Sequence, residues 1–318
     1  MLRKFAYNKI FRTTGMLLLF FLIIIFPVSK EYTLEDEKTV NTILTAKKKE
    51  VFLLDKNDYI SRINISFSYN SNEDYAKKLI ELLIIDGKYE QKVPNGFKAI
   101  LPSDTSINSV KIDNDSIYID LSSDFYNLKK DYEEKAIDAL TYNLTTIKDI
   151  NKVYINIDGK MLKYLPKSKK NITQPFGRKN GVNKKYDAIN YKNVSETTVY
   201  FTGKNNSTYY YVPVTKVNND NREKIKIIID ELTSSHIYQT NLMSFLNYNT
   251  KLLDYEIDGE VLTLNFNDYI FDDVNSKSIL EEVIYSICLS IRDNYSVKEV
   301  IFTVNGDEIV KSVLKNIE

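Results

Sequence analysis

The sequence has few of the residues from which common active sites are built. In 318 residues it has one cysteine, one histidine and no tryptophan. A lone cysteine, Cys288, excludes an intramolecular disulfide and a thiolate metal site, and its apolar neighbours predict a buried side chain. Any histidine-based metal site or Ser-His-acid triad would depend on His236, and its place just after a predicted helix favours a structural role. The nine glycines form no phosphate-binding pattern.

The sequence also has no excess of positive or negative charge. The chain carries 43 Lys and Arg against 43 Asp and Glu. No overall attraction to nucleic acid or to an acidic polymer is therefore indicated. The hydrophobic fraction of 43% argues against disorder, and the length allows two ordinary domains.

The one long apolar run, Met16 to Val28, is short at 13 residues, because a spanning helix needs about 17–25. Counting from Phe11 makes it 18 residues, with basic residues before it and acidic residues after it. We predict a cytoplasmic tail at 1–10, an uncleaved transmembrane signal anchor at 11–28 and a tether at 29–50. A cleaved signal peptide is the alternative, whereas a lipoprotein signal would need a cysteine after the run. The chain is thus expected to cross the cytoplasmic membrane once, with the later residues outside.

The two halves of the remaining chain resemble each other. Residues 145 positions apart match around Leu101 and Leu246, and the alternating strands that follow keep the same register. A helical stripe, a last strand and a closing Gly159 or Gly306 match at a shift of 147. This pattern predicts a duplicated domain.

Each copy reads as strand, strand, helix, strand, strand, helix, strand. In the first copy Ser71 is the predicted cap of the first helix and Gly87 suits its end. Residues 111–115 and 256–260, which include Asn114 and Gly259, are predicted tight turns between consecutive strands. We predict an α+β fold of two tandem small domains, each with two helices packed on one face of a mixed sheet. The predicted boundaries are 51–160 for the first domain, 161–195 for a basic linker, 196–310 for the second domain and 311–318 for a tail.

The linker is rich in basic residues. Residues 160–192 hold ten Lys or Arg and one acid, Asp187. It can be a solvated connection, or a patch for an anionic cell-wall polymer or lipid in which Lys169, Lys170 and Arg178 take part. Because the expected location outside the cytoplasmic membrane argues against a nucleic-acid groove, no nucleic-acid partner is predicted.

Two further groups of side chains merit attention. Tyr210 shares its strand face with Val212, so that face is predicted to be the buried one. Tyr209 and Tyr211 lie on the opposite face and are either an exposed interaction surface or buried within the tandem pair or against the linker. Four carboxylates of the first copy are a conceivable glycosidase pair or calcium site, but turn and strand positions explain them better. They are Asp113, Asp115, Asp120 and Asp124. We predict no catalytic residue, metal or cofactor.

A motif in the first copy runs from "LPSDTSINSVKIDNDSIYIDLSSDF" through a helix to "KVYINIDGK", and the second copy carries a degenerate form of it. This motif resembles the GerM domain of sporulation and germination proteins. Its positions are Leu101, Pro102, Thr105, Val110, Ile112, Asp120 and Gly159, then Leu246, Thr250, Ile257, Asn265 and Gly306.

The resemblance implies a fold similar to the ring-building motifs of secretion and sporulation channels, acting outside the cytoplasmic membrane. We therefore expect a non-enzymatic, membrane-anchored assembly protein of sporulation, germination or envelope morphogenesis. Its partners would be extracytoplasmic sporulation or envelope proteins with ring-building-like domains. The alternative is an envelope module that binds peptidoglycan fragments or anionic polymers in the cleft between its domains; an enzyme is the third hypothesis.

Overall fold

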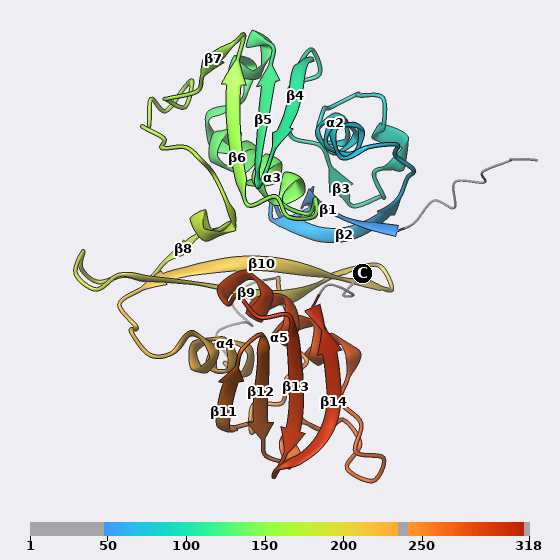
Figure 1. Cartoon of the computed structure of the whole chain (residues 1–318), viewed down its shortest axis with the longest axis vertical. Helices are drawn as coiled ribbons and strands as arrows, with labels where there is room; N and C mark the ends of the chain where they lie inside the picture. Colours follow the sequence, from blue (N-terminus) through green and yellow to red (C-terminus); the bar gives the residue numbers. More distant parts are fainter. Residues whose placement is uncertain (1–47, 235–240, 315–318) are drawn as a thin grey trace, which may run out of the picture. The chain divides into compact units, whose positions relative to one another are not determined.

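The structure is a computed structural model that describes residues 48–234 and 241–314. Residues 45–318 form one compact unit in which the two copies follow each other (Figure 1). The first copy comprises β1 (Lys48–Asp55), β2 (Ile60–Ser66), α2 (Asn72–Leu82), β3 (Phe97–Lys98), β4 (Ile107–Asp113), β5 (Ser116–Leu121), α3 (Glu133–Leu144), β6 (Lys152–Ile157) and β7 (Lys160–Met161). The predicted order of strands and helices is confirmed.

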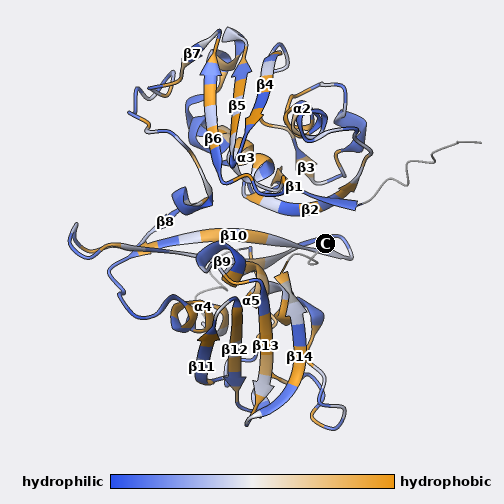
Figure 2. Ribbon diagram, in the orientation of Figure 1, coloured by the Kyte–Doolittle hydropathy of each residue, from blue (hydrophilic) through white to orange (hydrophobic). Residues whose placement is uncertain are grey.

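The second copy repeats this order. It comprises β9 (Ser195–Asn205), β10 (Thr208–Asn218), α4 (Lys224–Thr233), β11 (Leu252–Asp258), β12 (Val261–Phe266), α5 (Glu281–Asn294), β13 (Glu299–Val304) and β14 (Asp307–Val313). Since β14 runs past residue 310, the predicted boundary between the second domain and a tail is three residues too early. Hydrophobic and hydrophilic residues alternate along part of β10 (Figure 2), although residues 212–217 are all buried.

The duplication extends to the pairing of individual residues. In each copy an antiparallel hairpin, β4–β5 or β11–β12, is followed by a parallel strand, β6 or β13. Ile119 pairs with Val110 and Ile155, and Leu264 pairs with Tyr255 and Phe302. Both hairpins shift register at the same place, between 107 and 109 and between 252 and 254. Equivalent side chains therefore support one topology used twice.

One feature of the predicted domain is wrong. Instead of a single mixed sheet, each copy has a four-stranded sheet and a separate hairpin, β1–β2 or β9–β10. The helices lie between the hairpin and the sheet, with α3 contacting β1 and β2, and α4 and α5 contacting β9 (Figure 1). Consecutive residues are buried in all four hairpin strands, at 51–55, 60–63, 197–203 and 212–217, so both faces of each strand are covered. Alternation along the sequence could not reveal this.

Turn residues set the hairpins as predicted. Asn114 and Gly259 have φ angles of 53° and 57° in the two-residue turns of β4–β5 and β11–β12. Asn and Gly tolerate this left-handed backbone, which the right-handed twist of paired strands requires. The Pro102 carbonyl accepts from the Thr105 amide, and the Asn247 carbonyl accepts equivalently from Thr250. The Leu-Pro turn thus persists in the second copy without its proline.

The first helix begins as predicted but ends early. The Ser71 hydroxyl accepts a hydrogen bond from the Asp74 amide at 3.1 Å, the expected cap. The helix was predicted to reach Gly87, yet α2 stops at Leu82. Beyond it, Ile84 forms a bridge with Leu101, and the Ile85 amide bonds to the Leu101 carbonyl. This long-range pairing replaces the last helical turn.

The family-motif acid at Asp120 closes a turn. Its Oδ1 accepts the Gly159 amide at 2.9 Å, and Oδ1 of Asn265 accepts the Gly306 amide at 3.0 Å in the second copy. A side-chain oxygen is all that this bond needs, which explains why Asp and Asn interchange between the copies.

Replacement of Asp120 tests that role. We expect Asp120→Ala to lower the free energy of unfolding by about 1 kcal/mol, and Asp120→Asn to leave it nearly unchanged. Urea denaturation of the two variants beside the wild type measures this. A loss in Asp120→Asn equal to that in Asp120→Ala would show that the negative charge matters instead.

Candidate functional site: the junction between the two domains

The two hairpins meet in one sheet. Strand β10 pairs with β2 through Tyr211 and Arg62, and with the two-residue strand β8 (Lys185–Tyr186). The Tyr210 hydroxyl donates to Asp55 of β1 at 2.8 Å, and its ring meets Phe97 edge-on at 4.9 Å. The prediction that Tyr210 lies on the buried face is confirmed. Its surroundings belong to the first domain, so this residue ties the copies together.

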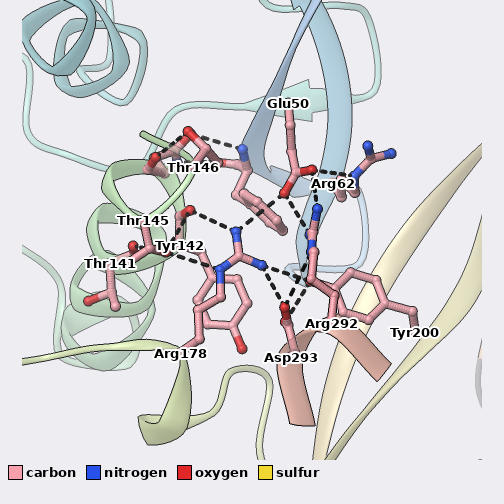
Figure 3. Close-up of polar contacts among 12 residues, drawn as sticks. Glu50, Arg62, Thr141, Tyr142, Thr145, Thr146, Arg178, Tyr200, Arg292 and Asp293 are labelled. Atoms are coloured by element: carbon pink, nitrogen blue, oxygen red, sulfur yellow. Dashed lines mark hydrogen bonds and ion pairs between the residues drawn. The ribbon is translucent and has the colours of Figure 1, made fainter. Parts of the chain in front are cut away.

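Glu50 is the centre of a largely buried ion cluster beside these strands (Figure 3). Its carboxylate contacts three guanidinium groups: Arg62 at 3.0 Å, Arg178 at 3.3 Å and Arg292 through two bonds of 2.8 Å. Arg62 comes from the same hairpin, whereas Arg178 comes from the linker and Arg292 from α5 of the second domain. One carboxylate therefore joins both domains and the segment between them.

Arg178 uses its whole side chain at the junction. It donates to Asp293 at 2.9 Å, to the Thr145 hydroxyl at 3.1 Å and to the Tyr142 carbonyl at 3.4 Å. The guanidinium also lies over the Tyr142 ring, 4.8 Å from its centre. Tyr142 and Thr145 form the C-terminal end of α3, where a cation is favoured by the helix dipole.

The second carboxylate completes the charge balance. Asp293 accepts from Arg178 and, at 2.8 Å, from the Tyr200 hydroxyl. The cluster contains three arginines and two carboxylates. Helices α3 and α5 both end at the cluster, and the C-terminus of each helix is equivalent to about half a negative charge. The cluster is thus close to neutral overall, which suits a permanent contact better than a vacant anion site.

The electrostatics follow from this geometry. Burial by itself would raise the pKa of Glu50, but Arg292, Arg62 and Arg178 outweigh it and hold that pKa far below its usual range. Burial followed by the nearby Asp293 raises the pKa of Tyr200, so its hydroxyl remains a donor. The carboxylate stays ionised and the phenol neutral at any physiological pH.

A cavity of about 570 Å³ lies next to the junction. Its walls include Arg178, Arg292 and Asp293 together with Lys48 and Lys298. The two arginines already bind carboxylates, so an anionic ligand would have to displace them.

The predicted basic patch is only partly exposed. Lys169 and Lys170 are exposed, and Lys170 pairs with Glu134 at 2.9 Å. Arg178, in contrast, is enclosed in the ion cluster, so its predicted availability to a polymer is wrong. The linker is also held elsewhere: Gln174 exchanges hydrogen bonds with the Ile155 backbone, and Val182 is fully buried. The interpretation of a solvated connection is therefore wrong for this part of it.

Tyr209 and Tyr211 differ in their exposure to solvent. Tyr209 is exposed and meets Phe245 edge-on at 5.0 Å, with Lys204 near its ring. Tyr211 is half-buried because it stacks on Tyr285 of α5, with ring centres 5.6 Å apart. Only Tyr209 keeps the exposed position that an interaction surface needs.

The four carboxylates do not converge. Asp115 pairs with Lys152 at 3.0 Å, Asp124 accepts from the Ser122 hydroxyl, and Asp120 holds the Gly159 amide. Among residues 48–234 and 241–314 no cluster of His, Cys, Asp and Glu has the grouping of a metal site. His236 lies outside the described residues. Cys288 is fully buried as predicted, and burial raises the pKa of its thiol to about 12.

An isolated carboxyl, Asp138, lines a second cavity of about 680 Å³. It is half-buried, and within the described part of the chain it forms no hydrogen bond or ion pair. Burial raises its pKa to about 8, only partly offset by Lys184. The folded pKa thus lies above the unfolded value of 3.8, so wild-type stability falls as the pH rises from about 3.8 to about 8.

Asp138→Asn removes that penalty. We expect the variant to exceed the wild type by at least about 1 kcal/mol in free energy of unfolding at pH 7.5, after allowance for partial exposure. The difference should shrink toward zero at pH 4. Urea denaturation at both pH values measures it, and a difference that does not change with pH would contradict the raised pKa.

Sequence reasoning missed the residues of the junction. Glu50 was assigned to a tether, and Arg62, Tyr200, Arg292 and Asp293 received no role. The signal available in the sequence was weak. It consisted of one charged residue in each of the first two strands, Glu50 and Arg62, and of the pair Arg292 and Asp293 near the end of a helix. The described helices include none with the length and apolar character to cross a membrane. The predicted anchor at 11–28 lies outside the described residues.

Comparisons with known proteins agree with this architecture. The Germane family model, described as sporulation and spore germination, matches residues 50–163 and 198–310. The spore germination protein GerM of Bacillus subtilis (strain 168) is 34% identical over 284 residues, covering 87% of this chain and 75% of the relative. The solved tandem GerMN domains of the sporulation protein GerM from Bacillus subtilis superpose with a TM-score of 0.74 at 34% identity, covering 83% of this chain and 92% of that one. The chain therefore belongs to the Germane family, the GerM-domain proteins of sporulation and spore germination.

Proposed function

We propose that this protein is a non-enzymatic, membrane-anchored assembly protein of sporulation or germination, acting outside the cytoplasmic membrane. It presents two GerM-like domains to partner proteins in one fixed relation. The observation that carries the proposal is the ion cluster in which Glu50 holds Arg178 of the linker and Arg292 of the second domain. If the two domains could rotate relative to each other, a partner that contacts both of them would have to fix their orientation, at a cost in entropy. Domains that are already fixed avoid this cost.

The sheets of both copies supply surfaces for such contacts. Among the described strands, β4 and β11 each pair on one side only, so backbone donors and acceptors line their outer edges. On β11 the side chains of Leu253 and Ile257 are exposed. Unpaired edges with apolar side chains suit strand addition or edge-to-edge packing with other small α+β domains, the partner class we propose.

Ligand binding between the domains is the weaker proposal. It requires a cavity with polar groups available to a ligand, whereas Arg178 and Arg292 in the cavity of about 570 Å³ are bonded to Glu50 and Asp293. An anionic polymer would have to compete with these charge-assisted bonds.

A pull-down from cells entering sporulation tests the assembly role. The full-length tagged chain is crosslinked in its host, and the membrane fraction is purified and identified by mass spectrometry. We expect envelope or sporulation proteins to be recovered with the wild type and to be reduced in Glu50→Ala. Recovery of no such protein above an untagged control would overturn the proposal.

The anchor has its own measurement. The full-length chain should stay in the membrane pellet after alkaline carbonate washing, whereas a chain beginning at residue 45 should be released. Release of both would contradict anchoring by residues 11–28.

A further inference from the structure

An exposed apolar loop joins β8 to β9. Residues 187–194 carry Ile189 and Tyr191, whose side chains are 93% and 103% exposed, the highest values for large hydrophobic residues in the described part of the chain. Tyr186 before the loop and Val194 at its end are exposed as well. Scattered apolar side chains are common on protein surfaces, but a group within nine residues marks an interaction site.

The loop is held in this conformation by one side chain. The Asn219 Oδ1 atom accepts the amides of Ile189 at 2.8 Å and Asn190 at 3.4 Å. Its Nδ2 atom donates to the carbonyls of Asn190 at 3.1 Å and Lys192 at 2.8 Å. Because the backbone is fixed on both sides of the apolar residues, their exposure is built into the fold.

The charges around the loop leave a positive surplus. Three acids near the loop have a partner in the chain: Asp187 pairs with Lys216, Glu196 with Lys184, and Asp220 with Arg222. Lys185 and Lys192, which flank the apolar residues, form no ion pair within the described residues. The loop therefore offers two unneutralised ammonium groups beside Ile189 and Tyr191.

We propose that loop 187–194 inserts Ile189 and Tyr191 into the surface of a membrane with anionic lipids, while Lys185 and Lys192 contact the headgroups. Tyrosine and lysine are the residues that settle at this depth, since each has an apolar body and a polar end. A stable protein interface needs about 800 Å² on each side, whereas the apolar group is one loop of a few residues. The location rests on the membrane attachment proposed above; loop binding would orient the tandem domains on that surface.

The absence of tryptophan makes a direct measurement possible. Residues 45–318 form one compact unit, and the tandem domains of the Bacillus subtilis relative were solved as a separate chain, so this part can be studied alone. Tyr191→Trp places a single indole in the loop. With vesicles of phosphatidylcholine and phosphatidylglycerol we expect its emission to move to shorter wavelength, and with pure phosphatidylcholine to move much less. Tyr248→Trp, at a position 78% exposed in the second domain, is the matched control and should not move.

Vesicle co-sedimentation tests the individual contributions. Ile189→Ser with Tyr191→Ser should reduce binding at least tenfold, whereas Tyr248→Ser with Val274→Ser should bind as the wild type. Lys185→Gln and Lys192→Gln should each weaken binding about fivefold on anionic vesicles. Unchanged circular dichroism confirms that the variants fold.

The proposal is overturned if the loop tryptophan does not respond to anionic vesicles, or if the loop and control variants bind equally. Crosslinking of position 191 to a protein, with no response to vesicles, would also overturn it by identifying a protein partner instead. These measurements use neither the anchor nor partner proteins, so their failure leaves the assembly proposal standing, and failure of the pull-down leaves lipid binding testable.

Discussion

Glu50→Ala should lower the free energy of unfolding of residues 45–318 by about 3–5 kcal/mol at pH 7, the cost of leaving buried charges without their counter-ion. The carboxylate neutralises Arg62, Arg178 and Arg292 at distances of 2.8–3.3 Å. After its removal Asp293 alone faces three guanidinium groups, of which Arg178 and Arg292 lie within its reach. Urea denaturation followed by circular dichroism gives the change, and the two domains should then separate into two transitions.

Glu134→Gln is the matched control for this experiment. Like Glu50, Glu134 forms an ion pair, in this case with Lys170 at 2.9 Å, but both side chains of this pair are more than half exposed. Solvent screens such a pair, so its loss should cost less than about 1 kcal/mol. A similarly small effect of Glu50→Ala would show that the cluster does not hold the domains together.

Asn143→Leu should cost about 2–4 kcal/mol, because two buried backbone groups lose their partners at once. On α3, Asn143 accepts the Phe52 amide at 3.0 Å and donates to the Phe52 carbonyl at 2.7 Å. These bonds fasten the helix to the backbone of β1. Leucine has the same branching and the same number of side-chain heavy atoms, so the hydrogen bonds are lost without leaving a cavity. Thermal and urea unfolding both measure the loss.

The second domain provides the comparison. Ser290 of α5 occupies the position equivalent to Asn143 and accepts the Tyr200 amide at 2.8 Å. Ser290→Ala leaves only one backbone group without a partner, so about 1–2 kcal/mol is expected. If Asn143→Leu were no more costly than Ser290→Ala, the double bond to Phe52 would not be stabilising the hairpin.

These predictions bear on function through rigidity. The ion cluster fixes one domain to the other, while the two hydrogen-bonded helices fix each hairpin to its own domain. Loosening either should impair binding that spans both domains more than it impairs folding of either sheet. Glu50→Ala is therefore the variant to combine with the pull-down, because each four-stranded sheet stays intact.

The sequence predicted what depends on neighbours along the chain. Alternating apolar residues placed Ile119 and Leu264 on buried strand faces, and Asn114 and Gly259 marked turns, because strand period and turn geometry involve only a few consecutive residues. The helix cap at Ser71 is local in the same way. Prediction was less accurate where pairing with a residue far along the chain competes with local helix formation. At the end of α2, Ile84 forms a β-bridge with Leu101 in place of a further helical turn.

The sequence by itself determined a duplicated β/α domain, its turns and its buried stripes. Only the tertiary structure decided that the two hairpins share a sheet, that Arg178 is enclosed, and that Glu50 joins three arginines. The physical reason is that a charged residue is stable either in water or beside an opposite charge. The residues next to it in sequence do not indicate which of these two environments it will have. That choice is made when β1, β2, the linker and α5, separated by up to 242 positions, come together.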